Sequence, residues 1–313
     1  MARHFLLIDP LEKLVIKKDS SILLALTLQE RGHEVYFFFE KDFAFNNRDT
    51  TSVSVTKFSG RIDQVTSYIS DFKLEDSIEC ELGASDILHM RLDPPFDARY
   101  LRVLWMLIAW QKQCGVQVVN DPRGIALHNE KLVAYERERS LHSFVGASES
   151  GFARYLEQLK KLGFDQLILK PLDLFQGYGV EKVSMSEAPQ TFVRKVKECG
   201  GALVAQPFDA SVLKGEIRSI YYKGKELGTI LKVPPEGKYL ANIAQGATFA
   251  KHDLSPALKN ECQQICGELA QDGVDWIAFD ILGENISEVN ITCPGLLVEV
   301  SKAMGENLAK YIS

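Results

Sequence analysis

The stretch WIAFDILGENISEVNIT, residues 276–292, predicts two strands joined by a turn, and the rest of the chain is interpreted outward from it. Along both halves apolar residues alternate with small or polar ones, which is typical of strands with one face in a core. Three side chains with oxygen atoms fall on the polar faces: Asp280, Glu288 and Asn290. Such a gathering in a half-buried hairpin calls for a physical reason.

The length of the turn decides whether the two carboxylates meet. A three-residue loop over residues 283–285, with Asn285 left-handed, places Asp280 directly across from Glu288, whereas a two-residue loop places Asp280 opposite Val289. Opposed like charges destabilise a sheet unless a cation lies between them, and two carboxylates with an amide oxygen suit Mg²⁺ shared with nucleotide phosphates. A solvated polar face on an edge hairpin is the alternative, and the hairpin alone does not decide between them.

The composition is that of an ordinary globular protein. A chain of 313 residues can bury a large core in two or three lobes. Its net charge of −6, without a Lys/Arg-rich run, argues against a nucleic-acid partner. No apolar stretch approaches bilayer length and the N-terminal apolar run is too short for a signal peptide, so we expect a cytoplasmic protein without a membrane partner. Six cysteines without a CxxC pair fit a reducing compartment, and we expect Cys262 and Cys266 to be buried.

The N-terminal third predicts a parallel α/β unit. A strand over residues 4–9 is followed by a helix from about Ser20, capped by Asp19 or Ser20, and by a strand over residues 34–39. A polar, β-rich middle, another strand, a helix over residues 100–114 and a last strand complete this third. Ligands of open α/β sheets collect where strands end, which singles out the loops over residues 9–18, 91–97 and 120–123.

The remaining two thirds predict a charged helix over residues 129–140, then helix, strand, loop and strand. The last third is richer in strands with short turns, such as a hairpin turn at Lys223 and Gly224. From this pattern we expect a mixed sheet with helices on one side.

Several residues have both a chemical and a structural interpretation. Lys170 ends an apolar strand before a loop with Gly177 and Gly179, an arrangement that can hold phosphate oxygens, although hairpin glycines are usually turn residues. Lys131, near a helix start, reads in isolation as a solvated surface lysine. Arg218 lies in a strand with buried neighbours and projects either into a cleft or into a surface salt bridge.

Pro207 cannot continue a central strand, so Gln206, Pro207 and Phe208 predict a connection between lobes. Such a crevice suits an adenine ring between apolar walls, with free backbone groups reading its edge. The six histidines form no spaced cluster, and each is expected to be structural.

In this order, these features resemble the bacterial glutathione synthetases of the ATP-grasp superfamily over essentially the whole chain. The segments that carry the resemblance are KDSS (18–21), DPPFD (93–97), VNDP (119–122), NEK (129–131), ILKPLD (168–173), AQPF (205–208), NIAQGA (242–247) and EVNITCP (288–294). The resemblance implies an α/β ATP-grasp fold with three lobes: an N-terminal parallel α/β domain (1–123), a central lid-like α+β subdomain (124–207) and a C-terminal mixed-sheet subdomain (208–313).

The resemblance also implies roles for residues. Lys131, Lys170, Gly177 and Gly179 would contact ATP phosphates, and Gln206, Pro207 and Phe208 would line the adenine site. Asp280, Glu288 and Asn290 would bind Mg²⁺ or Mn²⁺, and the catalytic Arg218 would steady the γ-phosphate and the acyl-phosphate formed from it. Substrate contacts would come from Asp19, Ser20, Lys232, Asn242 and Gly246. The implied reaction joins γ-glutamylcysteine to glycine with ATP, in a homo-oligomer that is a dimer or tetramer.

The chain departs from the family where substrate binds. Arginines of the family are replaced by Lys232, Leu240 and Thr248, and the phosphate loop carries bulkier residues at 174–176 (Leu174, Phe175, Gln176). Replacing an arginine fork by leucine removes a bidentate contact with a carboxylate, so a related peptide ligase with another substrate pair stays open. A nucleotide-binding paralogue without catalysis is the third alternative, although binding alone would not require Arg218 beside the metal residues.

Overall fold

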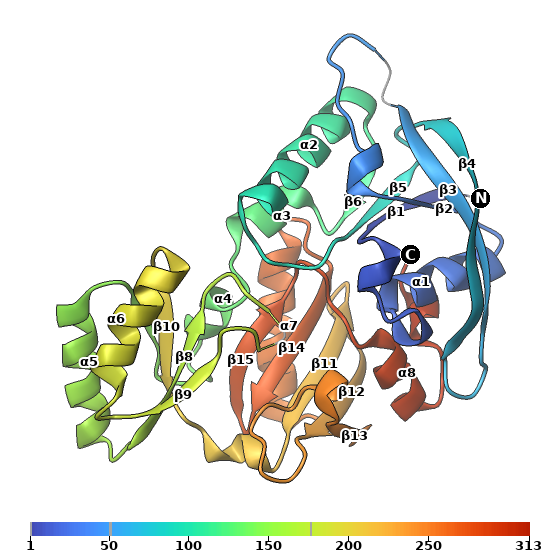
Figure 1. The fold of residues 1–313 in the computed structure, drawn as a ribbon. Helices are drawn as coiled ribbons and strands as arrows, with labels where there is room; N and C mark the ends of the chain where they lie inside the picture. The colour runs from blue at the N-terminus through green and yellow to red at the C-terminus, as the bar shows by residue number, and fades with distance from the viewer. Residues whose placement is uncertain (1, 50–51, 176) are drawn as a thin grey trace.

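The computed structural model of the protein describes residues 2–49, 52–175 and 177–313. Gln176, one of the bulky phosphate-loop residues, lies outside these ranges. Three sheets, one to a lobe, are arranged as Figure 1 shows, with the second lobe projecting from the other two. In the described part of the chain, no helix is long and apolar enough to cross a membrane.

The first lobe is built on a sheet with strand order β4-β3-β2-β1-β5-β6. Its strands are β1 (Arg3–Ile8), β2 (Glu34–Phe38), β3 (Ser52–Ile62), β4 (Ile69–Glu81), β5 (Ile87–Arg91) and β6 (Gln117–Val119). Strand β1 pairs in parallel with β2 and β5, and β5 pairs in parallel with β6, as predicted. Strands β3 and β4 form an antiparallel hairpin, and β3 also runs antiparallel to β2. Alternate residues of β1 pack against α1 (Ser20–Glu30) and α2 (Ala98–Cys114) on opposite faces, because successive side chains of a strand point to opposite sides.

The second lobe has an antiparallel sheet of order β7-β10-β8-β9. Its elements are β7 (Phe144–Gly146), α5 (Glu149–Lys161), β8 (Gln166–Pro171), β9 (Glu181–Ser184), α6 (Ala188–Cys199) and β10 (Leu203–Pro207). Both helices are amphipathic, and their rings meet where Phe152 of α5 stacks on Phe192 of α6 at 4.1 Å between centroids. Among the residues that the structure describes, the core of this lobe consists of residues between 144 and 205.

The third lobe has the strand order β13-β12-β11-β14-β15. Its elements are β11 (Glu216–Tyr222), β12 (Lys225–Val233), β13 (Thr248–Lys251), α7 (Pro256–Ala270), β14 (Trp276–Leu282), β15 (Asn285–Asn290) and α8 (Leu297–Met304). Each strand pair is antiparallel, which corrects our expectation of a mixed sheet here. Short turns join β11 to β12, at Lys223 and Gly224, and β14 to β15, whereas longer segments separate the strands of the other two pairs. Helix α7 covers one face of this sheet and α8 covers the other. The prediction that helices lie on one side only was therefore also wrong.

The decisive hairpin pairs Asp280 with Glu288, as the three-residue loop predicted, but by another route. Leu282 pairs with Asn285, so the turn has only two residues, and Gly283 rather than Asn285 has the positive φ, +60°. A β-bulge after this turn shifts the register and brings Glu288 opposite Asp280. The bulge residue Ser287 donates a hydrogen bond to the Asp280 carbonyl oxygen at 3.0 Å.

The charged helix predicted over residues 129–140 is wrong. Within residues 129–140 the structure has one short helix, α4 (Leu132–Tyr135), and another, α3 (Pro122–Leu127), ends just before this range. The carbonyl oxygens of Glu130 and Arg139 instead accept hydrogen bonds from the edge strand β15, at Val289 N (2.8 Å) and Ile286 N (2.7 Å). Where the chain bonds to this strand edge it does not continue as a helix, so the helical hydrogen bonds are confined to the turn around α4, and the periodic pattern predicted too long a helix.

The first and third lobes share one core. Apolar residues of α1, β1 and β2 pack in the same cluster as residues of α8, β11, β12 and β14. Asn120 reinforces this junction, since its amide donates to the carbonyl oxygens of Trp276 and Ile291, both at 2.8 Å. The first and third lobes therefore form one body, on which the second lobe stands.

Candidate active site

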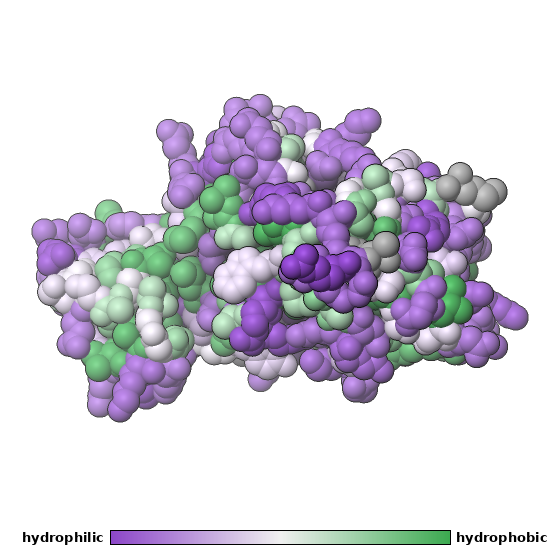
Figure 2. Space-filling model, turned by 90° about the horizontal axis from the view of Figure 1, so that it is seen from above, coloured by the Kyte–Doolittle hydropathy of each residue, from purple (hydrophilic) through white to green (hydrophobic). Residues whose placement is uncertain are grey.

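A cavity of about 440 Å³ opens between the lobes and is lined by residues from all three. Of the residues that the sequence predicted for the site, all but Gly179 and Gly246 line it. Seen from above, hydrophilic residues dominate the surface, and hydrophobic ones gather between the projecting lobe and the rest (Figure 2). One cavity thus brings together residues that are more than 270 positions apart in the sequence.

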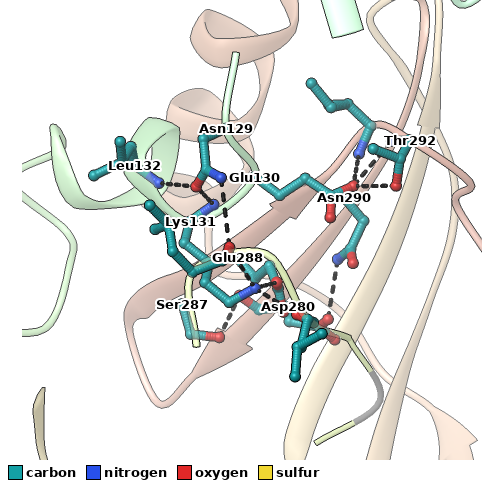
Figure 3. A network of polar contacts seen from close by, with 12 residues as sticks. Asn129, Glu130, Lys131, Leu132, Asp280, Ser287, Glu288, Asn290 and Thr292 are labelled. Carbon is teal, nitrogen blue, oxygen red and sulfur yellow. Dashed lines mark hydrogen bonds and ion pairs between the residues drawn. The ribbon is translucent and has the colours of Figure 1, made fainter. Parts of the chain in front are cut away.

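Lys131 is a buried residue of the cavity, with 4 % of its surface exposed. Its Nζ lies 2.9 Å from Glu288 Oε1 and donates to the Leu174 carbonyl oxygen at 2.8 Å. Figure 3 shows Lys131 reaching toward Glu288, while Glu130 points toward Thr292. The interpretation of Lys131 as a solvated surface lysine is therefore wrong, and the residue links the phosphate loop to the carboxylate hairpin.

Glu130 is a residue of the site that the sequence did not single out. Its Oε1 accepts hydrogen bonds from Ile291 N (2.7 Å), Thr292 N (2.9 Å) and Thr292 Oγ1 (2.8 Å). Burial and the neighbouring Glu288 raise the pKa of Glu130. These hydrogen bonds fix Glu130 to the segment at Ile291 and Thr292, and so they position the neighbouring Lys131. The position of Glu130 directly before Lys131 in the sequence is the signal that could have identified it.

Asp280 is surrounded by hydrogen-bond donors. Arg218 holds it through two bonds, Nε to Oδ1 at 2.9 Å and Nη2 to Oδ2 at 2.6 Å, and Lys232 Nζ lies 3.0 Å from Oδ1. The amide nitrogen of Asn290 donates to Oδ2 at 3.0 Å. Burial alone would raise the pKa of Asp280, but Arg218 and Lys232 outweigh it and lower that pKa to about 2. The carboxylate is therefore ionised throughout the neutral range.

Lys232, one of the three departures from the family, lies between two carboxylates of its own sheet. Besides Asp280, its Nζ contacts Glu216 Oε2 at 2.6 Å, and Glu216 is a second residue that the sequence did not single out. Burial raises the pKa of Glu216, whereas the two carboxylates raise that of Lys232 against its own burial. The other departures differ, because Leu240 lines the cavity while the exposed Thr248 does not.

Lys170 differs from the other cations of the site. Burial lowers its pKa, although Glu288, Glu216 and Asp280 act in the opposite direction. Its Nζ lies 5.6 Å from the centre of the Tyr135 ring, and within the described ranges it donates no hydrogen bond. A half-buried ammonium without an anionic partner at hydrogen-bond distance is suited to an anion that enters the cavity.

The predicted adenine wall ends strand β10. Pairing with β7 stops at Ala205, so among the described residues one side of Gln206 and Pro207 has no strand partner, whereas their other side pairs with β8. The ring of Phe208 meets Tyr239 edge-on at 6.2 Å, and Lys182 Nζ lies 3.4 Å from its centre. This arrangement leaves a free backbone edge beside apolar rings.

The loop between β12 and β13 closes over the phosphate loop. A Cδ atom of Leu240 lies 3.3 Å from the position that a Cβ on Gly177 would take, and Gly177 has φ +79°. A side chain at 177 would therefore be both strained and obstructed. Gly179 lies outside the cavity against Pro171, while Gly246 ends a short 3-10 turn that Asn242 caps.

Where α1 and α8 line the cavity, Asp19 caps α1 by accepting from Ser21 N and Ile22 N, both at 2.9 Å. Ser20 Oγ accepts a hydrogen bond from Leu297 N at 3.0 Å and so connects α1 with α8. Burial raises the pKa of Asp19. Both predicted substrate residues thus have structural partners in addition to lining the cavity.

The oxygen donors of the hairpin fit Mg²⁺ in kind. Within residues 2–49, 52–175 and 177–313, no three His, Cys, Asp or Glu side chains form a metal cluster by themselves. Mg²⁺, however, is usually bound by one or two carboxylates and completes its shell with waters and substrate phosphates. Asp280 and Glu288 supply two carboxylates, and the Asn290 amide adds a third oxygen of the same hard type.

Comparisons with known families agree with this arrangement. Residues 2–126 match the model described as "Prokaryotic glutathione synthetase, N-terminal domain", and residues 137–305 match "Prokaryotic glutathione synthetase, ATP-grasp domain". The glutathione synthetase of Coxiella burnetii is 28 % identical over 293 residues, covering 92 % of this chain and 88 % of that protein. The glutathione synthetase of Nitrosomonas europaea is 28 % identical over 310 residues, covering 97 % and 93 %.

Solved structures share the fold at low sequence identity. The D-cycloserine synthetase DcsG matches with a TM-score of 0.67 and 12 % identity, covering 98 % of this chain and 97 % of the other. A RimK domain protein ATP-grasp from Sphaerobacter thermophilus matches with a TM-score of 0.60 and 15 % identity, covering 99 % and 98 %. Both likenesses identify the three-lobed architecture as an ATP-grasp fold.

Proposed function

Because this chain belongs to the prokaryotic glutathione synthetase family and is an ATP-dependent, amide-forming ligase, we propose that it joins γ-glutamylcysteine to glycine. The products would be glutathione, ADP and phosphate. The names of its relatives in Coxiella burnetii and Nitrosomonas europaea support this substrate pair.

The observation that carries the proposal is the joint placement of cations and oxygen donors in one cavity. Lys131, Lys170, Arg218 and Lys232 lie with the Asp280–Glu288 hairpin between the free backbone edge of β10 and the N-terminus of α1. Positioning and charge neutralisation account for most catalysis of phosphoryl transfer, and both need this combination of groups.

In the proposed reaction, an oxygen of the peptide's C-terminal carboxylate attacks the γ-phosphorus of ATP and ADP leaves. The amine of glycine then attacks the acyl carbon, phosphate leaves, and the amine nitrogen loses a proton. Lys131 and Lys170 would bind the phosphates, beside the backbone of Gly177 and Gly179. Arg218 would exchange one of its bonds to Asp280 for an oxygen of the transferred phosphate and stabilise its charge.

Mg²⁺, or Mn²⁺ in its place, would be held by Asp280, Glu288 and Asn290 together with the phosphates of the nucleotide. When bound, the ion would neutralise phosphate charge and orient the γ-phosphate. Adenine would lie against Gln206, Pro207 and Phe208. Asp19, Ser20, Lys232, Asn242 and Gly246 would serve the peptide and glycine.

A second candidate is a related ligase with another substrate pair. Leu240 favours it, since this position is an arginine in the family and here presents an apolar side chain packed onto Gly177. A site without that fork would accept a substrate with fewer carboxylates.

Formation of ADP from Mg²⁺-ATP distinguishes the two candidates. We expect robust turnover with γ-glutamylcysteine and glycine, measured beside a panel of other peptides and amines. Turnover that appears only elsewhere on the panel would replace glutathione synthesis by the second candidate.

We further propose a cytoplasmic homo-oligomer, a dimer or a tetramer. The six unpaired cysteines support a reducing compartment, and the family resemblance supports self-association. Light scattering on the purified protein would measure the mass, and a monomer at micromolar concentration would contradict the oligomer.

A further inference from the structure

Glu299 of α8 is a buried carboxylate that lines the cavity, with 2 % of its surface exposed. Within the described part of the chain its Oε2 has no hydrogen-bond partner. Its other oxygen lies 3.9 Å from Lys18 Nζ, which is beyond hydrogen-bond distance. A buried ionised oxygen without a donor is unfavourable, so this atom is available for a donor that arrives with a ligand.

Glu299 stands out from the other acids at this end of the cavity. Asp19 accepts two backbone hydrogen bonds at the start of α1, and interaction with the Cys293 thiol opposes the burial that raises the pKa of Asp93. The nearby Arg91 does not neutralise Glu299 by contact, because it bonds Ser21 Oγ and the Pro294 carbonyl oxygen and stacks over Trp276. Among these three carboxylates in the described part of the chain, only Glu299 has a fully buried oxygen without a hydrogen-bond partner.

The charge of this end selects the kind of group that fits. Lys18 and Arg91 are cations beside Asp19, Asp93 and Glu299, and within the described ranges neither donates a hydrogen bond to Glu299. An ammonium that arrives with a ligand would therefore pair with Glu299 through a charge-assisted hydrogen bond. The cations that suit phosphates, Lys131 and Lys170, lie with the carboxylate hairpin instead. Burial raises the pKa of Glu299, although Lys18 and Arg218 act in the opposite direction. A cationic partner that binds beside Glu299 would lower this pKa again.

We propose that Glu299 binds the α-ammonium group of the peptide whose carboxylate is activated. The proposal rests on the proposed function, in which that peptide is γ-glutamylcysteine with the ammonium on its glutamyl residue. Glu299 would then be a specificity-determining residue: it would distinguish an α-amino peptide from an analogue of the same length without the amine.

N-glutaryl-cysteine tests this assignment, since it is γ-glutamylcysteine without the α-amino group. We expect the wild type to prefer γ-glutamylcysteine in kcat/KM by about 100-fold, the worth of a charged hydrogen bond in a buried site. Glu299→Gln keeps the shape and removes the charge, and its preference should fall to within about fivefold, mainly through a higher KM for γ-glutamylcysteine. The KM values for ATP and glycine should not change.

Two controls separate binding from folding. Glu306→Gln removes a carboxylate just beyond α8 that pairs with Lys310 on the surface, and it should keep the wild-type preference. Calorimetric titration of γ-glutamylcysteine into each variant with a non-hydrolysable ATP analogue should show the same loss for Glu299→Gln, and unchanged binding of the ATP analogue would establish that the variant is folded.

Three results would overturn the proposal. Equal kcat/KM values of the wild type for both peptides would show that it has no ammonium site, and would leave the proposed function intact. An unchanged preference in Glu299→Gln, with a higher KM for glycine, would assign Glu299 to the acceptor amine. Absence of turnover with γ-glutamylcysteine, while other pairs on the panel react, would refute the proposed function and this inference with it.

Discussion

Asp280 carries a negative charge inside the protein, and two buried cations account for it. Arg218 and Lys232 both contact its carboxylate, and Lys232 also contacts Glu216. Removing one member of such a cluster leaves a buried charge without its partner, which costs more than the pair itself contributes. Single substitutions at these positions therefore affect folding as well as chemistry, and controls must separate the two.

Asp280→Asn should lower the free energy of unfolding by about 3 kcal/mol at pH 7, because Arg218 and Lys232 lose their shared anion. The folded-state pKa of Asp280, about 2, lies below its ordinary value, so its contribution is complete above about pH 4 and disappears as the pH falls through 2. Urea unfolding of both proteins between pH 2 and 7 measures this. A difference that does not change over that range would contradict the assigned shift.

Glu288→Gln should lower kcat by on the order of 100-fold and raise the Mg²⁺ concentration needed for half-maximal rate, because one anionic ligand is lost. ADP formation across a Mg²⁺ series measures both. The matched control is Glu284→Gln, an exposed carboxylate in the turn of the same hairpin. Unchanged Mg²⁺ dependence would remove Glu288 from the metal shell.

Leu240→Arg should raise kcat/KM for γ-glutamylcysteine by about 10-fold, because it restores a guanidinium fork beside the phosphate loop. Leu240→Met, which keeps the apolar volume, should leave the value near that of the wild type. If both variants behave alike, the apolar side chain at 240 is not what sets the preference.

At the scale of elements, the carboxylate hairpin shows how much of a structure the alternation of apolar and polar residues can predict. Alternation placed Asp280 and Glu288 on polar faces, and they do pair, but the two-residue turn and the bulge at Ser287 produce this register together. Bulges follow from packing between strands, which a local pattern does not contain. The segment after Asn129 failed for a related reason, because backbone hydrogen bonds from β15 at Glu130 and Arg139 leave room for only one helical turn, α4, between them. Alternation and turn residues thus predicted the strands and which of their faces is polar. Contacts between distant segments determined the register of the hairpin and the length of the helix after Asn129.

Glu130→Gln should lower the free energy of unfolding by about 2 kcal/mol, since its carboxylate accepts three hydrogen bonds from Ile291 and Thr292. It should also raise the KM for ATP several-fold, because the neighbouring Lys131 loses its fixed position. Glu138→Gln, an exposed carboxylate of the same segment, is the control. Denaturation curves and ATP titrations check the two effects, and a change in stability without a change in KM would limit Glu130 to a structural role.

On the scale of the whole molecule, the order of chemical motifs predicted the ATP-grasp fold, but not how the lobes join. Asn120 and Arg91, which tie the first lobe to the third, were expected only as loop residues. Their partners are more than 150 positions away in the chain. Nothing in the local sequence identifies such partners, so the shared core had to come from the structure.

Native-state hydrogen exchange should show residues 144–207 opening at a lower free energy than the rest, because their core is separate and small. Amides of α1, β11 and α8 should exchange together as one unit. Binding of Mg²⁺-ATP should slow exchange in the second lobe more than in α1, since ligands stabilise the states that hold them. Equal opening free energies across all three lobes would show that the second lobe is not an independent unit.

The core that α1 and α8 share also constrains how natural and laboratory recombination can rearrange this protein. A chimaera that takes residues 2–123 from one relative and 208–313 from another must match two half-cores that evolved separately, and it starts with mispacked side chains at the seam. An exchange of residues 144–207 leaves that seam untouched and carries its own interior with it. The second lobe is thus the natural cassette for gene shuffling, whereas the two ends of the chain must be inherited together.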